Sequence, residues 1–478
     1  MKHFFNHSHN IIKITIVLSF ILSILISKYN LINYDKNILT DEYKYHQMIK
    51  TDSYRYMSLG AEIKRDLDNG INFFKTGPES YTKYLPSRIA AAYYYFFDLD
   101  LFNNFEDKKI NLGIHFPYLI IQCFVYYFSL FFLSLTLIKI FNKKIVLFTI
   151  IFLAVEPTLF QYHGTFWSES YFFSLQIILL ALVLNKNNKD YNFFFIGIFL
   201  GLLSLQKQMA IFYIVPIIVY FFLEIVKKPR KIFIIFFSFL IVQFFLGANN
   251  YIRSGEFYLL TADTKLDLHR DLVEVVMSNK NNTTRREFAV SEGDIAIKWI
   301  KDNFVPYNKL KVQNSAGKFT YMDYRGFILS ESDKVEFDNF IRNRTFKYIF
   351  NYPKDFILHI AKRSFHSALL NPFHIYSDHN FRSGEMYYET LTHKKLIPYR
   401  IMYSIFIYFI SILGLFYLFK NKNYQLLFLL FLSISYFFFL VSWHGNTRYF
   451  VPVLIYISLL FGNGSFFLFN KCYKKFFK

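Results

Sequence analysis

The stretch "IIKITIVLSFILSILISKYNLI" (residues 11–32) decides the fold class of this chain. A helix needs about 20 mostly apolar residues to cross a bilayer, and this run is long enough. No small-residue cleavage site follows it, so we expect a retained membrane anchor and not a cleaved signal peptide. Similar runs recur along the 478 residues, of which 54% are hydrophobic. The sequence therefore excludes a soluble multidomain enzyme and predicts a polytopic membrane protein.

The excess of positive charge has a topological explanation. The chain carries 54 Lys and Arg residues against 34 Asp and Glu, a formal net charge of +20. The basic residues gather in short segments between apolar runs, where the positive-inside rule places them in the cytoplasm, so we expect no nucleic-acid partner. Cys123 lies in an apolar run and Cys472 in the basic tail, which argues against a disulfide and against a cysteine metal site.

Apolar runs predict ten membrane-spanning helices, at residues 11–32, 114–138, 145–162, 167–184, 191–205, 209–226, 232–248, 398–419, 424–441 and 449–469. If the N-terminus is cytoplasmic, every short basic loop lies inside. The long hydrophilic segments 33–113 and 249–397 then lie outside, and the acidic residues are concentrated in them. We expect an all-α polytopic membrane protein with a small α/β or mixed outer subdomain.

Three parts follow from this pattern. Residues 1–263 form an N-terminal transmembrane module that contains the first outer loop, and residues 264–355 form an outer soluble subdomain. Residues 356–478 hold a membrane-surface helix and the C-terminal transmembrane helices. The surface helix is predicted from "DFILHIAKRSFHSALL" (355–370), which has apolar positions at helical spacing with cations between them.

The first outer loop contains a doubled hexapeptide. It reads Thr-Asp-Glu-Tyr-Lys-Tyr at 40–45 and Thr-Asp-Ser-Tyr-Arg-Tyr at 51–56. On an unbroken helix, Asp41 and Asp52 would share one face about 16 Å apart, too far to act as one carboxylate pair. Either Asp is then a candidate reaction centre, with Glu42 beside the first. The ordinary alternative is a solvated helix whose acids favour its N-terminal end.

Four cations are candidates for binding a phosphate. Lys83 and Arg88 flank "LP" beside an apolar stretch, where they could hold a lipid-linked phosphate or serve as plain interface anchors. Lys207 marks an outer helix junction. Arg448 precedes the last span on the outer side, against the inside preference of cations, and is therefore more informative than an inner Lys.

Two carboxylates occur near the outer ends of predicted spans. Glu169 begins a span in "FWSESYFF", and Glu156 precedes Pro157 at the end of the span before it. An ionisable group at such a depth is costly and marks a candidate site, although the helix dipole also supports an acid at the first turn. We interpret His163, between these two spans, as a loop histidine in preference to an acceptor contact.

Taken together, these features resemble the C-type glycosyltransferase superfamily, which includes protein O-mannosyltransferases and the aminoarabinose transferases acting on lipid A. The likeness rests on an ordered set of short motifs over nearly the whole chain. These are Asp-acid-x-x-Tyr at Asp41 or its second copy at Asp52, then "TKYLP" with Lys83, then Glu169, then "TRYFVP" at 447–452. "NNYIRSGEF" and "FNYPKDFILHIAKR" resemble the family's outer-loop entry and its return to the membrane.

The resemblance implies a membrane glycosyltransferase with a catalytic first outer loop (33–113). The composition and the absence of eukaryotic domains suggest a bacterial chain, so we expect the inner membrane, with the site facing the periplasm. It implies a polyprenyl-phosphate-linked sugar donor, a glycolipid, glycan or protein acceptor, and an inverting transfer in which an outer-loop Asp is the general base. We favour Asp52 as that base, with Asp41 second. Some members of the family hold a divalent metal, Mg or Mn, and others use none; Asp52 and Glu169 are the candidate ligands here.

Two other classes of membrane protein are alternatives. A transporter or flippase for a lipid-linked or anionic solute would need ionisable groups near the bilayer midplane and broken helices in paired repeats. A polysaccharide polymerase or ligase would be expected to hold its site in one late outer loop with paired arginines. The candidate residues lie instead at the outer surface and in the first loop, which favours the transferase.

Overall fold

The computed structural model describes residues 2–38, 52–76, 84–99, 115–185, 189–225, 229–255, 257–259, 266, 268–304, 320, 331–370, 391–441 and 447–476. These residues form helices and the turns between them, and no strand occurs among them. The all-α class is therefore confirmed. The β component expected for the outer subdomain is not found in the described part of the chain.

The chain divides into two compact units. Unit 1 comprises residues 1–61, 85–242 and 363–478, and unit 2 comprises residues 62–84 and 243–362. Unit 1 contains the apolar helices, whereas unit 2 collects most of the polar ones.

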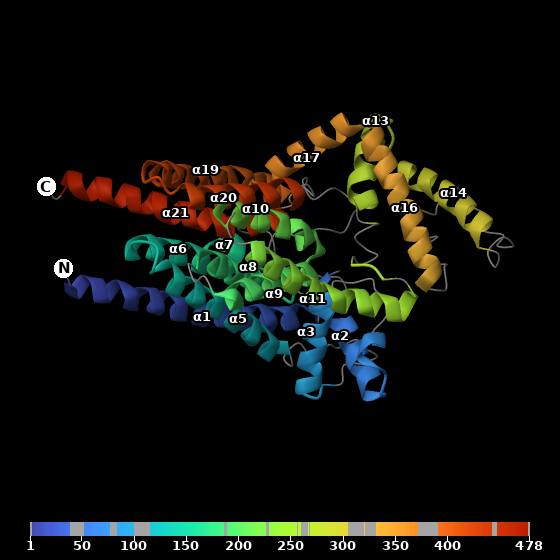
Figure 1. Cartoon of the computed structure of the whole chain (residues 1–478), viewed down its shortest axis with the longest axis horizontal. Coiled ribbons are helices and arrows are strands. Elements are labelled where there is room, and N and C mark those ends of the chain that lie inside the picture. The colour runs from blue at the N-terminus through green and yellow to red at the C-terminus, as the bar shows by residue number, and fades with distance from the viewer. Residues whose placement is uncertain are drawn as a thin grey trace. The chain divides into compact units, whose positions relative to one another are not determined.

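Unit 1 is a bundle of long helices (Figure 1). In chain order it contains α1 (Lys2–Ile38), α5 (Phe116–Leu137), α6 (Lys143–Val155), α7 (Pro157–Phe160), α8 (Glu169–Leu184), α9 (Asp190–Gln206), η3 (Gln208–Tyr213), α10 (Ile214–Ile225), α19 (Leu391–Lys420), α20 (Tyr424–Ser435), η7 (Tyr436–Val441) and α21 (Thr447–Phe476). It also takes the start of α2 (Asp52–Asp68), most of α3 (Tyr84–Phe96) and the first half of α11 (Pro229–Ser254).

Six described helices are long and apolar enough to cross a membrane, and each coincides with a predicted span. They are Asn10–Tyr29, Phe116–Leu137, Pro229–Ile252, Ile397–Lys420, Tyr424–Val441 and Tyr449–Cys472. Three shorter apolar helices, Glu169–Leu184, Asp190–Gln206 and Gln208–Phe222, occupy three more predicted runs. The protein is thus a polytopic membrane protein by length and composition, while the predicted total of ten spans is not reached by this measure.

One predicted span is not a single helix. The run 145–162 was expected to cross the membrane, but α6 ends at Val155 and the separate turn α7 begins at Pro157. The reason is local: Pro157 occupies the first helical position of α7, and the Glu156 carboxylate accepts the Leu159 N–H at 2.7 Å as an N-cap. A proline at this position ends the preceding helix because it lacks the donor N–H.

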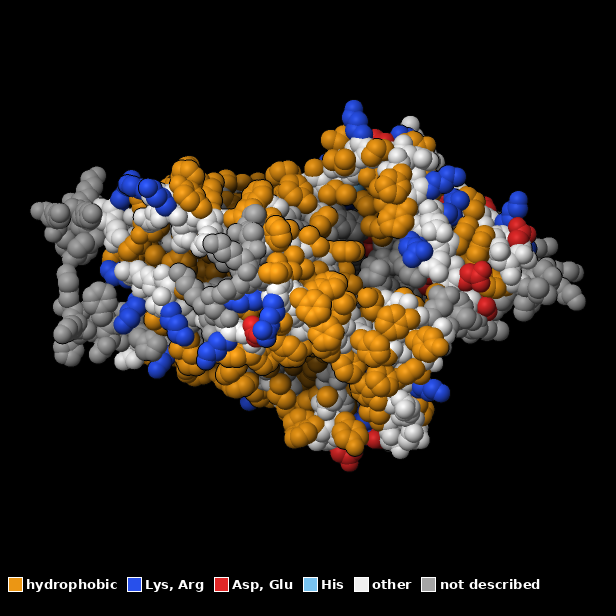
Figure 2. Space-filling model, in the orientation of Figure 1, with side chains coloured by type: hydrophobic (Ala, Val, Ile, Leu, Met, Phe, Trp, Pro, Cys, Tyr) orange, Lys and Arg blue, Asp and Glu red, His pale blue; other side chains and the backbone are white. Residues whose placement is uncertain are grey.

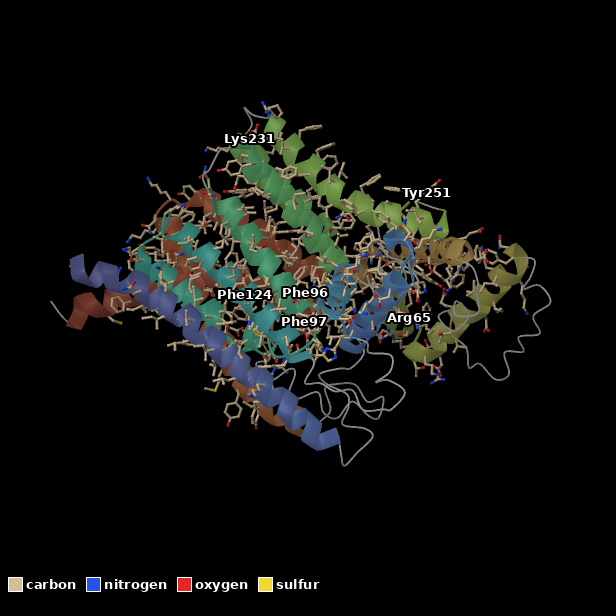
Figure 3. The ribbon with its side chains drawn as sticks, turned by 90° about the horizontal axis from the view of Figure 1, so that it is seen from below. Arg65, Phe96, Phe97, Phe124, Lys231 and Tyr251 are labelled. Carbon is tan, nitrogen blue, oxygen red and sulfur yellow. The ribbon has the colours of Figure 1, made fainter. Side chains whose placement is uncertain are left out.

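Lys and Arg residues gather at one end of unit 1. Figure 2 shows them at the left of the bundle, beyond a broad apolar surface, and Figure 1 shows the N- and C-terminal ends there as well. We call this the basic end; it includes Lys143, Lys144, Lys189, Arg230, Lys231, Lys420 and Lys471. Each helix of unit 1 that starts or stops at these loops has its other terminus at the opposite end, which we call the far end. Figure 3 shows Lys231 at the basic end of α11 and Tyr251 near its other terminus.

Glycines allow helices of unit 1 to cross closely. A Cβ added to Gly414 of α19 would lie 1.8 Å from the Leu460 carbonyl oxygen of α21, and one added to Gly464 would lie 1.9 Å from the Ile410 carbonyl oxygen. On another face of α21, a Cβ at Gly462 would lie 2.0 Å from Thr149 Oγ1 of α6. Small residues at such contacts let helix backbones approach in a membrane, where packing replaces the hydrophobic effect.

Unit 2 contains the polar helices. Its described elements are the end of α2, η1 (Phe73–Lys75), the second half of α11, η4 (His269–Val273), α13 (Glu274–Lys280), α14 (Arg285–Asn303), α16 (Glu331–Asn351) and most of α17 (Pro353–Ser367). Thr284 and Glu287 form a reciprocal capping box that starts α14. A small apolar core holds this unit together, and its buried members are Leu266, Ala296, Ile300, Phe304, Phe337 and Ile341. The helix predicted near 355–370 is present as α17.

Candidate functional site

A buried ion pair lies at the far end of unit 1. Glu169 is the first residue of α8, and Lys207 is the residue at which α9 ends and the chain tightens into η3. The Lys207 Nζ lies 2.6 Å from Glu169 Oε1, with side-chain exposures of 3% and 0%. Both were singled out from the sequence, Lys207 for phosphate binding and Glu169 as a cavity acid. Their direct pairing was not foreseen, because 37 residues separate them in the chain.

Aromatic rings surround the ammonium group of Lys207. Its Nζ lies 5.4 Å from the ring centroid of Phe172 and 5.8 Å from that of Tyr449. Tyr449 is the third residue of α21 and directly follows Arg448. The start of α21, where Arg448 was singled out, therefore lies beside the pair formed by Lys207 and Glu169.

The turn between α7 and α8 is held by a side chain from α5. The Gln122 Nε2 donates to the carbonyl oxygens of Thr165 at 2.9 Å and His163 at 3.2 Å, and lies 3.4 Å from that of Tyr162. From the other side, Gln206 Nε2 donates to the Ser168 carbonyl oxygen at 2.9 Å. These bonds fix the backbone that presents Glu169, since buried carbonyls that lose their donors are costly.

His163 lies in this turn, as expected for a loop histidine, but its ring is buried. Its Nδ1 lies 2.9 Å from Ser170 Oγ, and its ring packs on Tyr126 with centroids 3.9 Å apart. This geometry is that of a packed core residue that orients the first turn of α8.

Glu156, the other predicted carboxylate, has a structural position. Beyond capping α7, its Oε1 accepts a 2.5 Å hydrogen bond from the Tyr403 hydroxyl of α19. Glu156 is only 3% exposed. The signal in the sequence is Pro157, because proline favours the first position of a helix.

Irregular helices meet in the core of unit 1. The Tyr213 hydroxyl of η3 lies 2.5 Å from that of Tyr456 and 2.7 Å from Ser433 Oγ. The π-helical turn η7 follows Ser433, and Pro452 lies inside α21. Gln176 of α8 donates to the Pro452 carbonyl oxygen at 2.8 Å, which satisfies an acceptor near the proline. Irregular turns of this kind recur at functional sites in membrane and soluble helices.

Most predicted residues of the first outer loop fall outside the described part of the chain. Asp41, Glu42 and Lys83 lie outside it entirely. The backbone of Asp52 begins α2 and that of Arg448 is the second residue of α21, but their side chains are not among those described.

Arg88 and Gly60 lie in the described part of the chain. Arg88 is partly buried on α3, and α2 crosses α3 so closely that a Cβ at Gly60 would lie 2.6 Å from Ala90 Cβ. The small-residue helix "MSLGAEI" after the second hexapeptide is thus a packing surface. α3 ends in exposed aromatics, including Phe96 and Phe97 (Figure 3).

Glu62, further along α2, was not singled out from the sequence. Burial raises the pKa of its carboxyl group; the charge of Arg65 opposes this and that of Asp66 adds to it. A half-buried acid with a raised pKa is a candidate proton acceptor or donor. Its neighbours in the sequence gave no hint of its burial.

A second buried charge cluster lies in unit 2. Glu292 of α14 accepts hydrogen bonds from Arg344 at 2.7 Å to each oxygen and from the Tyr348 hydroxyl at 2.6 Å. The Nε2 of His269 lies 3.6 Å from the same carboxylate. Burial acts to raise the pKa of Glu292, but the hydrogen bonds from His269, Arg344 and Tyr348 outweigh it and lower the pKa to about 2. This cluster joins η4, α14 and α16.

No group of three or more His, Cys, Asp and Glu residues placed to hold a metal ion occurs among the described residues. Of the two candidate ligands, Glu169 is paired with Lys207, and the side chain of Asp52 is outside the described set.

No family model matches this chain, and no curated protein matches it significantly. Its function must therefore be argued from the residues themselves.

Proposed function

We propose that this protein is a membrane glycosyltransferase that moves a sugar from a polyprenyl-phosphate donor to a hydroxyl-bearing acceptor. The observation that carries the proposal is the pairing of Lys207 with Glu169 beside Tyr449, which gathers three separately predicted segments at the far end of unit 1. A lipid-linked phosphate needs cations close to a membrane-embedded tail, and Lys207 is a cation at the far end of unit 1.

The roles follow from the charges. Lys207, with Lys83, Arg88 and Arg448, is proposed to bind the donor phosphate and stabilise it as it leaves. A phosphate oxygen can replace the Glu169 carboxylate as the partner of Lys207, because both are anionic oxygen acceptors for an ammonium group. Asp52, with Asp41 as second choice and Glu42 beside it, is proposed as the general base on the acceptor hydroxyl in an inverting transfer.

The proposal includes the number of membrane crossings and the orientation of the protein in the membrane. The short apolar helices α8, α9 and α10, together with α6, are proposed to complete ten membrane crossings. The far end then faces the periplasm and the basic end the cytoplasm of a bacterial inner membrane, in agreement with the positive-inside rule. Membrane lipid and a glycolipid, glycan or protein acceptor are the proposed partners. Asp52 and Glu169 are the residues that would hold a divalent metal, Mg or Mn.

Transfer from a radiolabelled polyprenyl-phosphate sugar to endogenous acceptors in membranes tests this function. Asp52→Asn, Asp41→Asn and Lys207→Met are compared with Asp302→Asn, which alters an exposed acid of α14 in unit 2. We expect Asp52→Asn to lower transfer by about 100-fold or more, since general-base catalysis contributes 10²–10⁴-fold. Full activity in both Asp41→Asn and Asp52→Asn would contradict the catalytic role of the first outer loop.

A transporter of a lipid-linked or anionic solute is the second candidate. The irregular turns η3 and η7 and the buried pair of Lys207 and Glu169 favour it, because transporters place ion pairs where membrane helices are broken. The same membranes separate the two functions. Solute uptake into vesicles without any release of sugar from the donor would support transport and contradict transfer.

A further inference from the structure

Helix α17 has two unlike faces. Phe356, Ser364 and Ser367 are buried on one side, at 2%, 0% and 0% exposure. Leu358 and Phe365 are exposed on the opposite side, at 58% and 67%. These two lie seven residues apart, which is close to two helical turns, so they line one apolar stripe together with the exposed Ile357. A stripe of large exposed apolar side chains on a helix in a polar segment indicates that this face contacts a membrane or another apolar partner.

The C-terminal end of α17 is anchored to the far ends of membrane-spanning helices. The Phe365 ring packs on Phe438 of η7, with centroids 5.1 Å apart. Just beyond α17, the Leu370 N–H donates to Ser404 Oγ of α19 at 3.0 Å, and Arg400 Nε donates to the Leu370 carbonyl oxygen at 3.2 Å. Ser404 and Phe438 belong to helices long and apolar enough to span a bilayer. The C-terminal part of α17 (Figure 1) therefore packs on helices that are long and apolar enough to span a bilayer.

The charge of α17 matches an anionic surface. Lys354 and Lys362 are exposed, and Arg363 adds a third cation. The single acid of the helix, Asp355, is paired with Lys280 at 2.8 Å. A Lys beside an apolar stripe can lay its alkyl chain on the membrane while its ammonium group reaches the phosphates.

We propose that α17 lies in the interface of the bilayer, with Leu358 and Phe365 among the acyl chains and Lys354 and Lys362 on the headgroups of anionic phospholipids. The helix thereby fixes the depth at which the polar segment after α16 returns to the membrane. This inference does not depend on sugar transfer.

Fluorescence quenching in nanodiscs tests the proposal on the full chain. In a Cys472→Ser background, which removes the exposed cysteine and leaves the buried Cys123, bimane is attached at Leu358→Cys, Phe365→Cys or, as a water-exposed control, Arg286→Cys. Nitroxide is carried by the headgroup of phosphatidylglycerol or of phosphatidylcholine at equal mole fraction. Water-soluble iodide serves as the opposing quencher.

We expect lipid nitroxide to quench positions 358 and 365 and iodide to quench position 286. Phosphatidylglycerol nitroxide should quench position 358 more strongly than phosphatidylcholine nitroxide. Combining Lys354→Glu with Lys362→Glu should abolish that preference, because each Lys near an anionic surface favours it about fivefold. Iodide quenching at 358 and 365 equal to that at 286 would overturn the membrane placement. Equal quenching by the two lipids would overturn the anionic preference. The agreement of two labelled positions guards against a variant that disturbs folding.

Discussion

Removing one partner of the pair between Lys207 and Glu169 should destabilise unit 1 more than changing both. Lys207→Met removes the ammonium group that lies 2.6 Å from the Glu169 carboxylate, whose side chain is at 0% exposure. Breaking a buried pair from one side costs about 3–5 kcal/mol, whereas replacing both charges is often close to neutral. Glu169→Gln should cost less, because the two rings at 5.4 and 5.8 Å still stabilise the ammonium group.

The measurement is a double-mutant cycle in which Lys207→Met, Glu169→Gln and the double variant are unfolded reversibly in detergent or nanodiscs. The matched control is the pair of Arg230 and Asp190 at the basic end, which has a similar separation of 2.7 Å but exposures of 80% and 47%. Arg230→Met should cost no more than about 1 kcal/mol, since exposed pairs contribute little.

Comparing Lys207→Met with Arg230→Met also tests whether burial determines how much an ion pair contributes to the free energy of unfolding. If Lys207→Met costs no more than Arg230→Met, water reaches the pair in the folded protein, and the reasoning from burial is wrong. If the double variant is less stable than the unmodified protein by the sum of the two single losses, the two side chains do not interact. A large coupling of about 2 kcal/mol or more is the expected result.

Three further outcomes are expected. Gly464→Ala should lower the free energy of unfolding by about 1–3 kcal/mol, because its Cβ meets the Ile410 carbonyl oxygen and α19 and α21 must separate; an unchanged melting temperature would contradict this crossing. Gly60→Ala should likewise loosen α2 from α3, seen as faster proteolysis near residue 60, and equal cleavage in both proteins would argue against the contact. Glu292→Gln should lose on the order of 3 kcal/mol at neutral pH, because the folded pKa of Glu292 is lowered from 4.5 to about 2. That contribution is present above pH 4.5 and lost as the pH falls through about 2, so the variant should show a flatter acid-unfolding curve in this window.

The fold class was open to prediction because bilayer length and apolar composition leave few choices. Six predicted spans coincide with long helices, and the basic loops gather at one end of unit 1 as charge patterning indicated. The run 145–162 misled because its hydrophobicity continues through Glu156 and Pro157, where capping chemistry ends the helix. A hydrophobic run predicts that a segment is surrounded by apolar material. The end of a helix depends instead on which backbone N–H groups can donate hydrogen bonds.

The candidate site was predictable only in part. Glu169 and Lys207 were chosen one at a time, since an ionisable group near a helix end is visible in sequence. Their contact depends on the packing of α8 against α9, which no local pattern records. The cluster around Glu292 was missed for the same reason, because its partner Arg344 lies 52 residues away in the chain.

The grip of Gln122 on the turn between α7 and α8 bears on how this chain could change over time or by design. Its amide reaches backbone oxygens and no side chain of the turn. For this contact, substitutions in the turn should be tolerated better than insertions. Any residue offers the same backbone carbonyl oxygen, whereas an insertion would move that oxygen out of reach of the Gln122 amide. The path of the backbone in this turn thus depends on a side chain of α5, which lies about 40 residues earlier in the chain.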